Sequence, residues 1–135
     1  MTAIEQQAIQ AATEALEETL HDFNQNEKLI RDEIPNLPDF SGSTRIASEK
    51  EMPMLLAKKL QEECDEAIAE LLLIDPGMPN QDLTEELADI FEVILAMAFH
   101  TGIDMTKVYD IANDKRTQRG GFQNGVILVQ SSSDK

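Results

Sequence analysis

The chain has 135 residues, of which 41% are hydrophobic and 4% aromatic, and its formal net charge is −15. This length predicts one domain with its own core, and the surplus of acids argues against binding to nucleic-acid polymers or to anionic membranes. A single cysteine, Cys64, excludes an internal disulfide, and no apolar run reaches the roughly 18 residues that span a bilayer. Because the N-terminus also lacks the pattern of a signal peptide, we expect a cytoplasmic protein.

The first expected element is a helix over residues 2 to about 24, where small and apolar residues recur at helical spacing. Beyond it, Pro35, Pro38 and Gly42 argue against a long regular element. At most a short helical turn is expected there, over residues 29–33.

A second long helix is expected to begin near Pro53, a residue that suits a first helical turn. Ser48 and Glu51 have the spacing of a capping box just before it. The sequence Asp-Pro-Gly at 75–77 is expected to stop this helix.

The third helix is expected to run from Asp82 or Thr84 to Thr101, with Gly102 as its C-cap. Asp104 can cap a fourth helix, which would end near Arg119.

A short irregular or extended segment is expected over 121–129, and a disordered tail over 131–135. Four helices joined in part by short loops predict an all-α fold, a four-helix antiparallel bundle.

Acids interrupt the apolar stripe of the second helix. Glu63 stands where an apolar residue is due, and Glu66 follows one turn later. Glu66 lies three residues from Glu63 and four from Glu62, so the three acids overlap on one side of the helix. A buried carboxylate needs a partner, a metal or a proton, so Glu63 is unlike an ordinary helical acid.

The third helix repeats this pattern, because Glu86 and Asp89 are three residues apart and share a stripe with Val93. Antiparallel packing of the two helices would bring together four carboxylates: Glu63, Glu66, Glu86 and Asp89. Such an all-oxygen site suits a hard divalent cation, Mg²⁺ above all.

Other acids on these helices are expected to face solvent, as helical acids usually do. This applies to Asp65, Glu70 and Glu85, whereas Glu92 is either a support of the metal ligands or a surface residue.

Cations are few but clustered. Lys115, Arg116 and Arg119 crowd the end of the fourth helix, and Lys28 with Arg31 forms a second group. Cations favour helix C-termini through the macrodipole, and they also bind anions such as phosphate.

Taken in order, these motifs resemble the MazG-like all-α nucleoside triphosphate pyrophosphohydrolases, which are related to phosphoribosyl-ATP pyrophosphohydrolase. The family signature EExxE…ExxD reads "EECDE" from Glu62 and "ELAD" from Glu86. One subgroup also has KLVRDKIP and KRxxRGGF, which read here "KLIRDEIP" from Lys28 and "KRTQRGGF" from Lys115, with Glu33 in place of the second Lys of KLVRDKIP.

The resemblance implies Mg²⁺-dependent hydrolysis of a nucleoside triphosphate to the monophosphate and pyrophosphate, with Mn²⁺ as a substitute metal. It implies a house-cleaning role and a homodimer or larger homo-oligomer. It spans residues 27–130 as the catalytic domain and leaves residues 1–26 as a helical extension packed on the bundle.

The resemblance also implies roles for residues. Glu63, Glu66, Glu86 and Asp89 would hold the metal, and Glu62 is the candidate base that orients the attacking water. The substrate-binding candidates are Asn113, Lys115, Arg116, Arg119, Lys28 and Arg31.

Three other kinds of protein are alternatives to this hypothesis. A di-iron bundle needs two Glu-x-x-His motifs, and only Glu18 and His21 have that spacing. A Ca²⁺ loop over 22–33 would have Glu27 where glycine is obligatory. The strongest alternative is a non-catalytic helical-bundle module that binds a nucleotide or a protein, since a fold does not imply a function.

Overall fold

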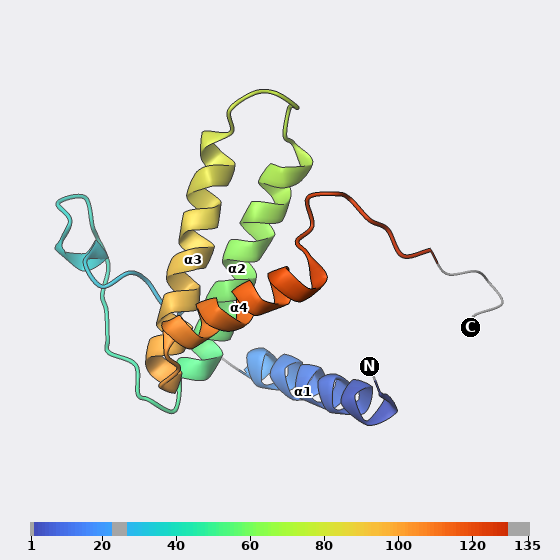
Figure 1. The fold of residues 1–135 in the computed structure, drawn as a ribbon. Coiled ribbons are helices and arrows are strands. Elements are labelled where there is room, and N and C mark those ends of the chain that lie inside the picture. The colour runs from blue at the N-terminus through green and yellow to red at the C-terminus, as the bar shows by residue number, and fades with distance from the viewer. Residues whose placement is uncertain (1, 23–26, 130–135) are drawn as a thin grey trace. The chain divides into compact units, whose positions relative to one another are not determined.

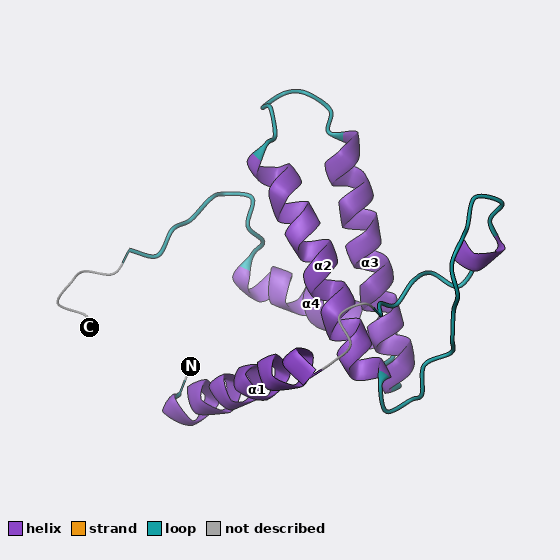
Figure 2. Cartoon of the chain, turned by 180° about the vertical axis from the view of Figure 1, so that it is seen from behind, coloured by secondary structure: helices purple, strands orange, loops and turns teal. Residues whose placement is uncertain are grey.

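The computed structural model describes residues 2–22 and 27–129. These residues form α1 (Ala3–Asp22), η1 (Ile34–Asn36, a 3-10 turn), α2 (Met52–Leu72), α3 (Gln81–Thr101) and α4 (Met105–Arg119), as Figure 1 and Figure 2 show. No β-strand occurs within these ranges, so the all-α prediction is confirmed.

The short helical turn lies at η1 rather than over 29–33, because Pro35 fits the first turn of a helix. The segment 121–129 contains a turn and is otherwise irregular. The expected tail 131–135 and the last expected residues of the first helix lie outside the described residues.

The chain divides into two compact units, Met1–Thr101 and Gly102–Lys135. α1, α2 and α3 belong to the first unit, and α4 belongs to the second. No helix of the described ranges is long and apolar enough to cross a membrane.

α2 and α3 lie side by side and run antiparallel (Figure 1). The buried hydrophobic residues of the described chain all lie on these two helices: Met52, Leu55, Leu56, Ala67, Val93 and Ala98. Leu71, which the sequence places on the same stripe of α2, is 54% exposed near the end of the helix. The core of this unit is therefore small and lies toward the start of α2 and the end of α3.

The start of α2 has the predicted capping box. The N–H of Ser48 donates to Oε2 of Glu51 at 2.9 Å, and the N–H of Glu51 donates to Oγ of Ser48 at 3.3 Å. Arg45 binds the same Glu51 carboxylate and also that of Glu27, which ties the segment before η1 to the start of α2.

α3 begins at Gln81, one residue before Asp82, the earlier of the two expected starts, because Asn80 caps it. Oδ1 of Asn80 accepts a hydrogen bond from the N–H of Leu83 at 2.8 Å. At the other end Gly102 has φ +72°, as expected of a glycine C-cap.

α4 begins as predicted, since Oδ1 of Asp104 accepts a hydrogen bond from the N–H of Thr106 at 2.9 Å. It ends at Arg119, and Gly120 follows with φ +80°. Apart from the half-buried Met105, its residues are exposed within the described chain.

Candidate metal centre

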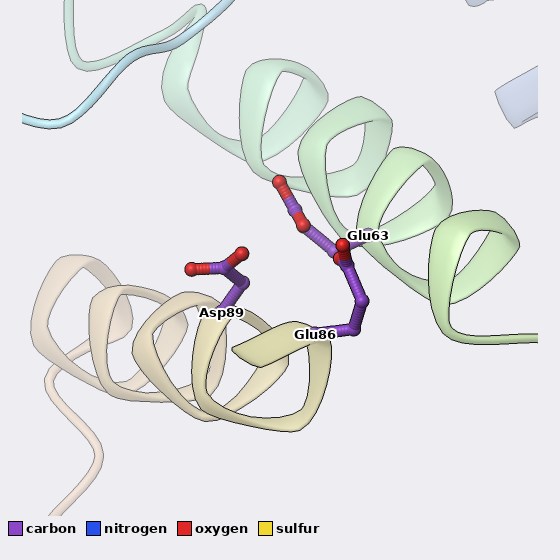
Figure 3. Close-up of side chains that lie close together, drawn as sticks. All are labelled: Glu63, Glu86 and Asp89. Carbon is purple, nitrogen blue, oxygen red and sulfur yellow. The ribbon is translucent and has the colours of Figure 1, made fainter. Parts of the chain in front are cut away.

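Three of the four predicted metal ligands converge between α2 and α3. Glu63, Glu86 and Asp89 each offer one carboxylate oxygen, and these oxygens lie within 4.8 Å of one another. Figure 3 shows the three side chains pointing toward the same space, Glu63 from α2 and the other two from α3. Because Glu86 and Asp89 are three residues apart, they share one face of α3.

The acids of this cluster are partly removed from water, which makes their negative charges costly. Glu63 is 6% exposed, and Glu86 and Asp89 are half-buried. Oε2 of Glu63 and Oε2 of Glu86 are buried, and neither has a hydrogen-bond partner within the part of the chain that the structure describes. A buried unpaired carboxylate oxygen is costly, so two of them facing one space fit a site for a hard cation.

Glu66, the fourth predicted ligand, is exposed on α2 but interacts with the cluster through Glu86. The pKa of Glu86 is raised from 4.5 to about 7, first by burial of its carboxyl group. A hydrogen bond to Glu66 and the negative charges of Glu66, Glu63 and Asp89 raise it further. Glu86 therefore keeps a proton to higher pH than an ordinary glutamate.

Lysines balance part of the negative charge on α2. Lys28 Nζ lies 3.3 Å from Oε1 of Glu62, the candidate base, and Lys59 Nζ lies 3.7 Å from its Oε2. Lys59 also lies 3.2 Å from Oε1 of Glu63. Sequence analysis missed Lys59, although its spacing of three and four from the two acids could have indicated these pairs.

Arg31 binds the cluster from outside the two helices. Its Nη2 lies 2.7 Å from Oδ1 of Asp89, across 58 positions of sequence. Lys28 and Arg31, both predicted to bind substrate, therefore lie against predicted catalytic and metal-binding acids.

The remaining substrate-binding candidates lie on α4, in the second unit. All four are exposed: Asn113, Lys115, Arg116 and Arg119. Glu92 is exposed on α3, which agrees with a surface residue.

Two antiparallel helices thus bring acids together beside cations, which is what the resemblance to the MazG-like all-α pyrophosphohydrolases leads us to expect. The chain belongs to the phosphoribosyl-ATP pyrophosphohydrolase family of this superfamily, since the profile of that family matches residues 23–116. This match includes the acids of both helices and the basic end of α4 up to Arg116. Membership assigns the chain to pyrophosphohydrolases that act on nucleotide-like substrates. Comparison with curated proteins and with solved structures gives no significant match.

Proposed function

We propose that this protein is a Mg²⁺-dependent nucleoside triphosphate pyrophosphohydrolase. It cleaves the bond between the α- and β-phosphates with one water and yields a nucleoside monophosphate, pyrophosphate and a proton. The observation that carries the proposal is the convergence of Glu63, Glu86 and Asp89, with two buried carboxylate oxygens that have no partner among the described residues. Removal of non-standard or surplus nucleotides is the cellular role that we propose.

Glu63, Glu86 and Asp89 would hold the ion, and Glu66 would join them by turning its exposed carboxylate inward. The donor set consists of carboxylate oxygens only, which fits Mg²⁺ and allows Mn²⁺ to replace it. When bound, a divalent ion supplies positive charge against the triphosphate and makes water a stronger acid.

Glu62 is the proposed general base. It lies next to Glu63 on α2, and its carboxylate is paired with Lys28 and Lys59 rather than buried alone. A carboxylate in this position can accept a proton from water. Transfer of one lysine to a phosphate oxygen would leave an oxygen of Glu62 free for that proton.

Cations of the chain would neutralise the rest of the substrate. Arg31 can bind a phosphate through two parallel hydrogen bonds, which its guanidinium geometry favours. The proposed phosphate and sugar contacts from α4 are Asn113, Lys115, Arg116 and Arg119.

The substrate itself has two candidates. Nucleoside triphosphates are the first, and the name of the matched family makes phosphoribosyl-ATP the second. Both contain the same triphosphate chain, so the metal site does not separate them. A non-catalytic module that only binds a nucleotide or protein is the alternative to both.

The test is a panel of canonical and modified nucleoside triphosphates and phosphoribosyl-ATP, incubated with the full chain and Mg²⁺, with all phosphate products quantified. We expect a monophosphate and pyrophosphate in equal amounts. Glu63→Gln should lower turnover by more than about 100-fold, because even changes beside metal ligands cost about 10- to 100-fold. It should also abolish the stabilisation of the fold by Mg²⁺.

Asp65→Asn is the matched control. Asp65 is an exposed acid on the same helix, bonded only to Gln61 among the described residues, so its change should leave turnover unaltered. Full activity of Glu63→Gln would overturn the metal site, and no turnover of any substrate would favour the binding module.

We also propose that the chain acts in the cytoplasm as a homodimer or larger homo-oligomer. The free thiol of Cys64 fits a reducing compartment. Oligomerisation is supported by apolar side chains that are exposed on α3, such as Leu87 and Phe91.

A further inference from the structure

The segment 27–33, which we call the strap, brings two cations to the acids. Lys28 binds Glu62, the proposed base. Arg31 binds Asp89, one of the proposed metal ligands. The strap is not helical, so its side chains are not fixed by a regular element. The strap thus brings one positive charge to the proposed base and another to a proposed metal ligand.

The strap is fixed at its first residue. Arg45 donates to both carboxylate oxygens of Glu27 at 2.8 and 3.1 Å, and Lys58 Nζ donates to the carbonyl oxygen of Glu27 at 3.0 Å. Leu29 packs against the buried core around Leu55 and Leu56, and beyond Arg31 the described contacts of the strap are local ones, such as that of Glu33 with Asn36. Arg31 is 55% exposed, which leaves its guanidinium room to move.

Two of the three converging acids have a cation of the chain beside them. Oδ1 of Asp89 lies 2.7 Å from Nη2 of Arg31, which comes from the strap, and Oε1 of Glu63 lies 3.2 Å from Nζ of Lys59, which is on the same helix. Glu63 and Glu86 each also keep one buried oxygen without a partner in the described chain. A divalent ion held by all three acids would lie close to the guanidinium and would repel it. The same guanidinium can bind a phosphate of the substrate instead.

We propose that Arg31 is an internal counter-ion that competes with the metal for Asp89 and moves to a phosphate of the substrate when the metal is bound. This inference rests on the proposed metal site and adds a positioning role for the strap. Metal entry then releases the phosphate-binding group, so that the site binds substrate best once it holds its metal. Asp89 is therefore bound either by Arg31 or by the metal.

The test is the affinity of the full chain for Mn²⁺ without nucleotide, measured by titration calorimetry on the wild type, Arg31→Met and Lys28→Met. Arg31→Met should bind Mn²⁺ about two- to fivefold more tightly, which is the size of effect expected on losing an exposed ion pair. Lys28→Met removes the same charge from the same strap, but its partner is not a proposed ligand, so its affinity should stay within about twofold of the wild type.

A second measurement needs no variant. Saturating Mg²⁺ should speed amide hydrogen exchange of Ile34 in the wild type. Its N–H donates to the carbonyl oxygen of Arg31 at 3.1 Å, and that turn loses its contact with α3 when Arg31 leaves Asp89.

The outcomes separate this inference from the proposed function. Failure of the wild type to bind Mn²⁺ would overturn both. Normal wild-type binding with equal or weaker binding by Arg31→Met would overturn the inference alone, since Arg31 would then support Asp89 rather than compete for it. Equal tightening in Lys28→Met, or unchanged exchange of the Ile34 amide, would also overturn it.

Discussion

The pKa of Glu86 is raised because its carboxyl group is partly removed from water and lies among other acids. Its carboxyl group is half-buried, bonded to Glu66 and surrounded by the charges of Glu63 and Asp89. Removal from water and repulsion both disfavour the charged form, and its pKa rises to about 7. Glu86 therefore holds its proton closer to neutral pH than an ordinary glutamate does. A divalent ion would displace that proton.

This raised pKa predicts how the stability of the metal-free protein depends on pH. The folded protein keeps the Glu86 proton up to about pH 7, whereas the unfolded chain releases it near pH 4.5. The contribution of Glu86 to the free energy of unfolding is therefore present below pH 4.5 and is lost as the pH rises through 7. Urea denaturation in EDTA across this window should show the decline.

Glu86→Gln should remove this component of the decline. Mg²⁺ should flatten the wild-type profile as well, because metal binding favours the deprotonated carboxylate. An identical pH dependence in Glu86→Gln and the wild type would contradict the prediction.

At the scale of elements, the segment before α2 is as important as the two long helices. Arg45 joins Glu27 to Glu51, and Glu51 also closes the capping box with Ser48. The same contacts thus fix the start of α2 and the beginning of the strap that carries Arg31. Arg45 thus connects the start of α2 to the strap, although it does not contact the acids that converge between α2 and α3.

Arg45→Met should destabilise the protein in a pH-dependent way. Arg45 lowers the pKa of Glu51 to about 2 and also lowers that of Glu27, both from 4.5, chiefly through hydrogen bonds to their side chains. The resulting stability is present above pH 4.5 and is lost as the pH falls toward 2. The difference in unfolding free energy between wild type and variant should therefore shrink over this range in urea denaturation.

Lys50→Met is the control for this change, because it removes a charge from the same segment before α2 and the described residues give Lys50 no ion pair. A difference between wild type and Arg45→Met that stayed constant from pH 7 to 2 would contradict the role of the two carboxylates.

Several ends of the helices could be predicted from capping residues that lie next to them in the sequence. Ser48 with Glu51, Asp104 and Gly102 act within a few residues of their own position, so their capping roles could be predicted. α3 begins ahead of both expected starts, Asp82 and Thr84, because Asn80 caps it through the N–H of Leu83.

The acid cluster could be predicted from its spacing on two helices, whereas its partners could not. Arg31 and Asp89 are 58 positions apart, and nothing local to either residue indicates that they meet. Lys59 was missed for a different reason, since its pairs with Glu62 and Glu63 resemble the ordinary ion pairs of any helix surface.

At the scale of the whole molecule, the small core is the most informative feature. Only six hydrophobic residues are buried in the described ranges, while one face of α3 exposes Leu87, Phe91 and Ile94. These residues are spaced by four and three, so they form one apolar stripe. An exposed stripe of this kind is typical of an interface, which supports the proposed homo-oligomer.

Phe91→Glu should weaken the oligomer. Phe91 is 57% exposed at the middle of the stripe, and a charge there would have to be buried at the interface without a partner. Light scattering coupled to size exclusion should give a dimer or larger species for the wild type and a shift toward the monomer for the variant. Glu92→Gln, on the adjacent exposed position, should leave the mass unchanged. A monomeric wild type would contradict the proposal.

The most direct test of the central proposal is the bond that the wild-type protein cuts. Turnover with Mg²⁺ in water labelled with the heavy isotope of oxygen marks the phosphorus that water attacks, and mass spectrometry of the separated products locates the label. Attack at the α-phosphorus, with the acids of α2 and α3 facing the triphosphate, predicts the label in the nucleoside monophosphate and none in the pyrophosphate. Label in the pyrophosphate, or release of labelled orthophosphate with a nucleoside diphosphate, would contradict it.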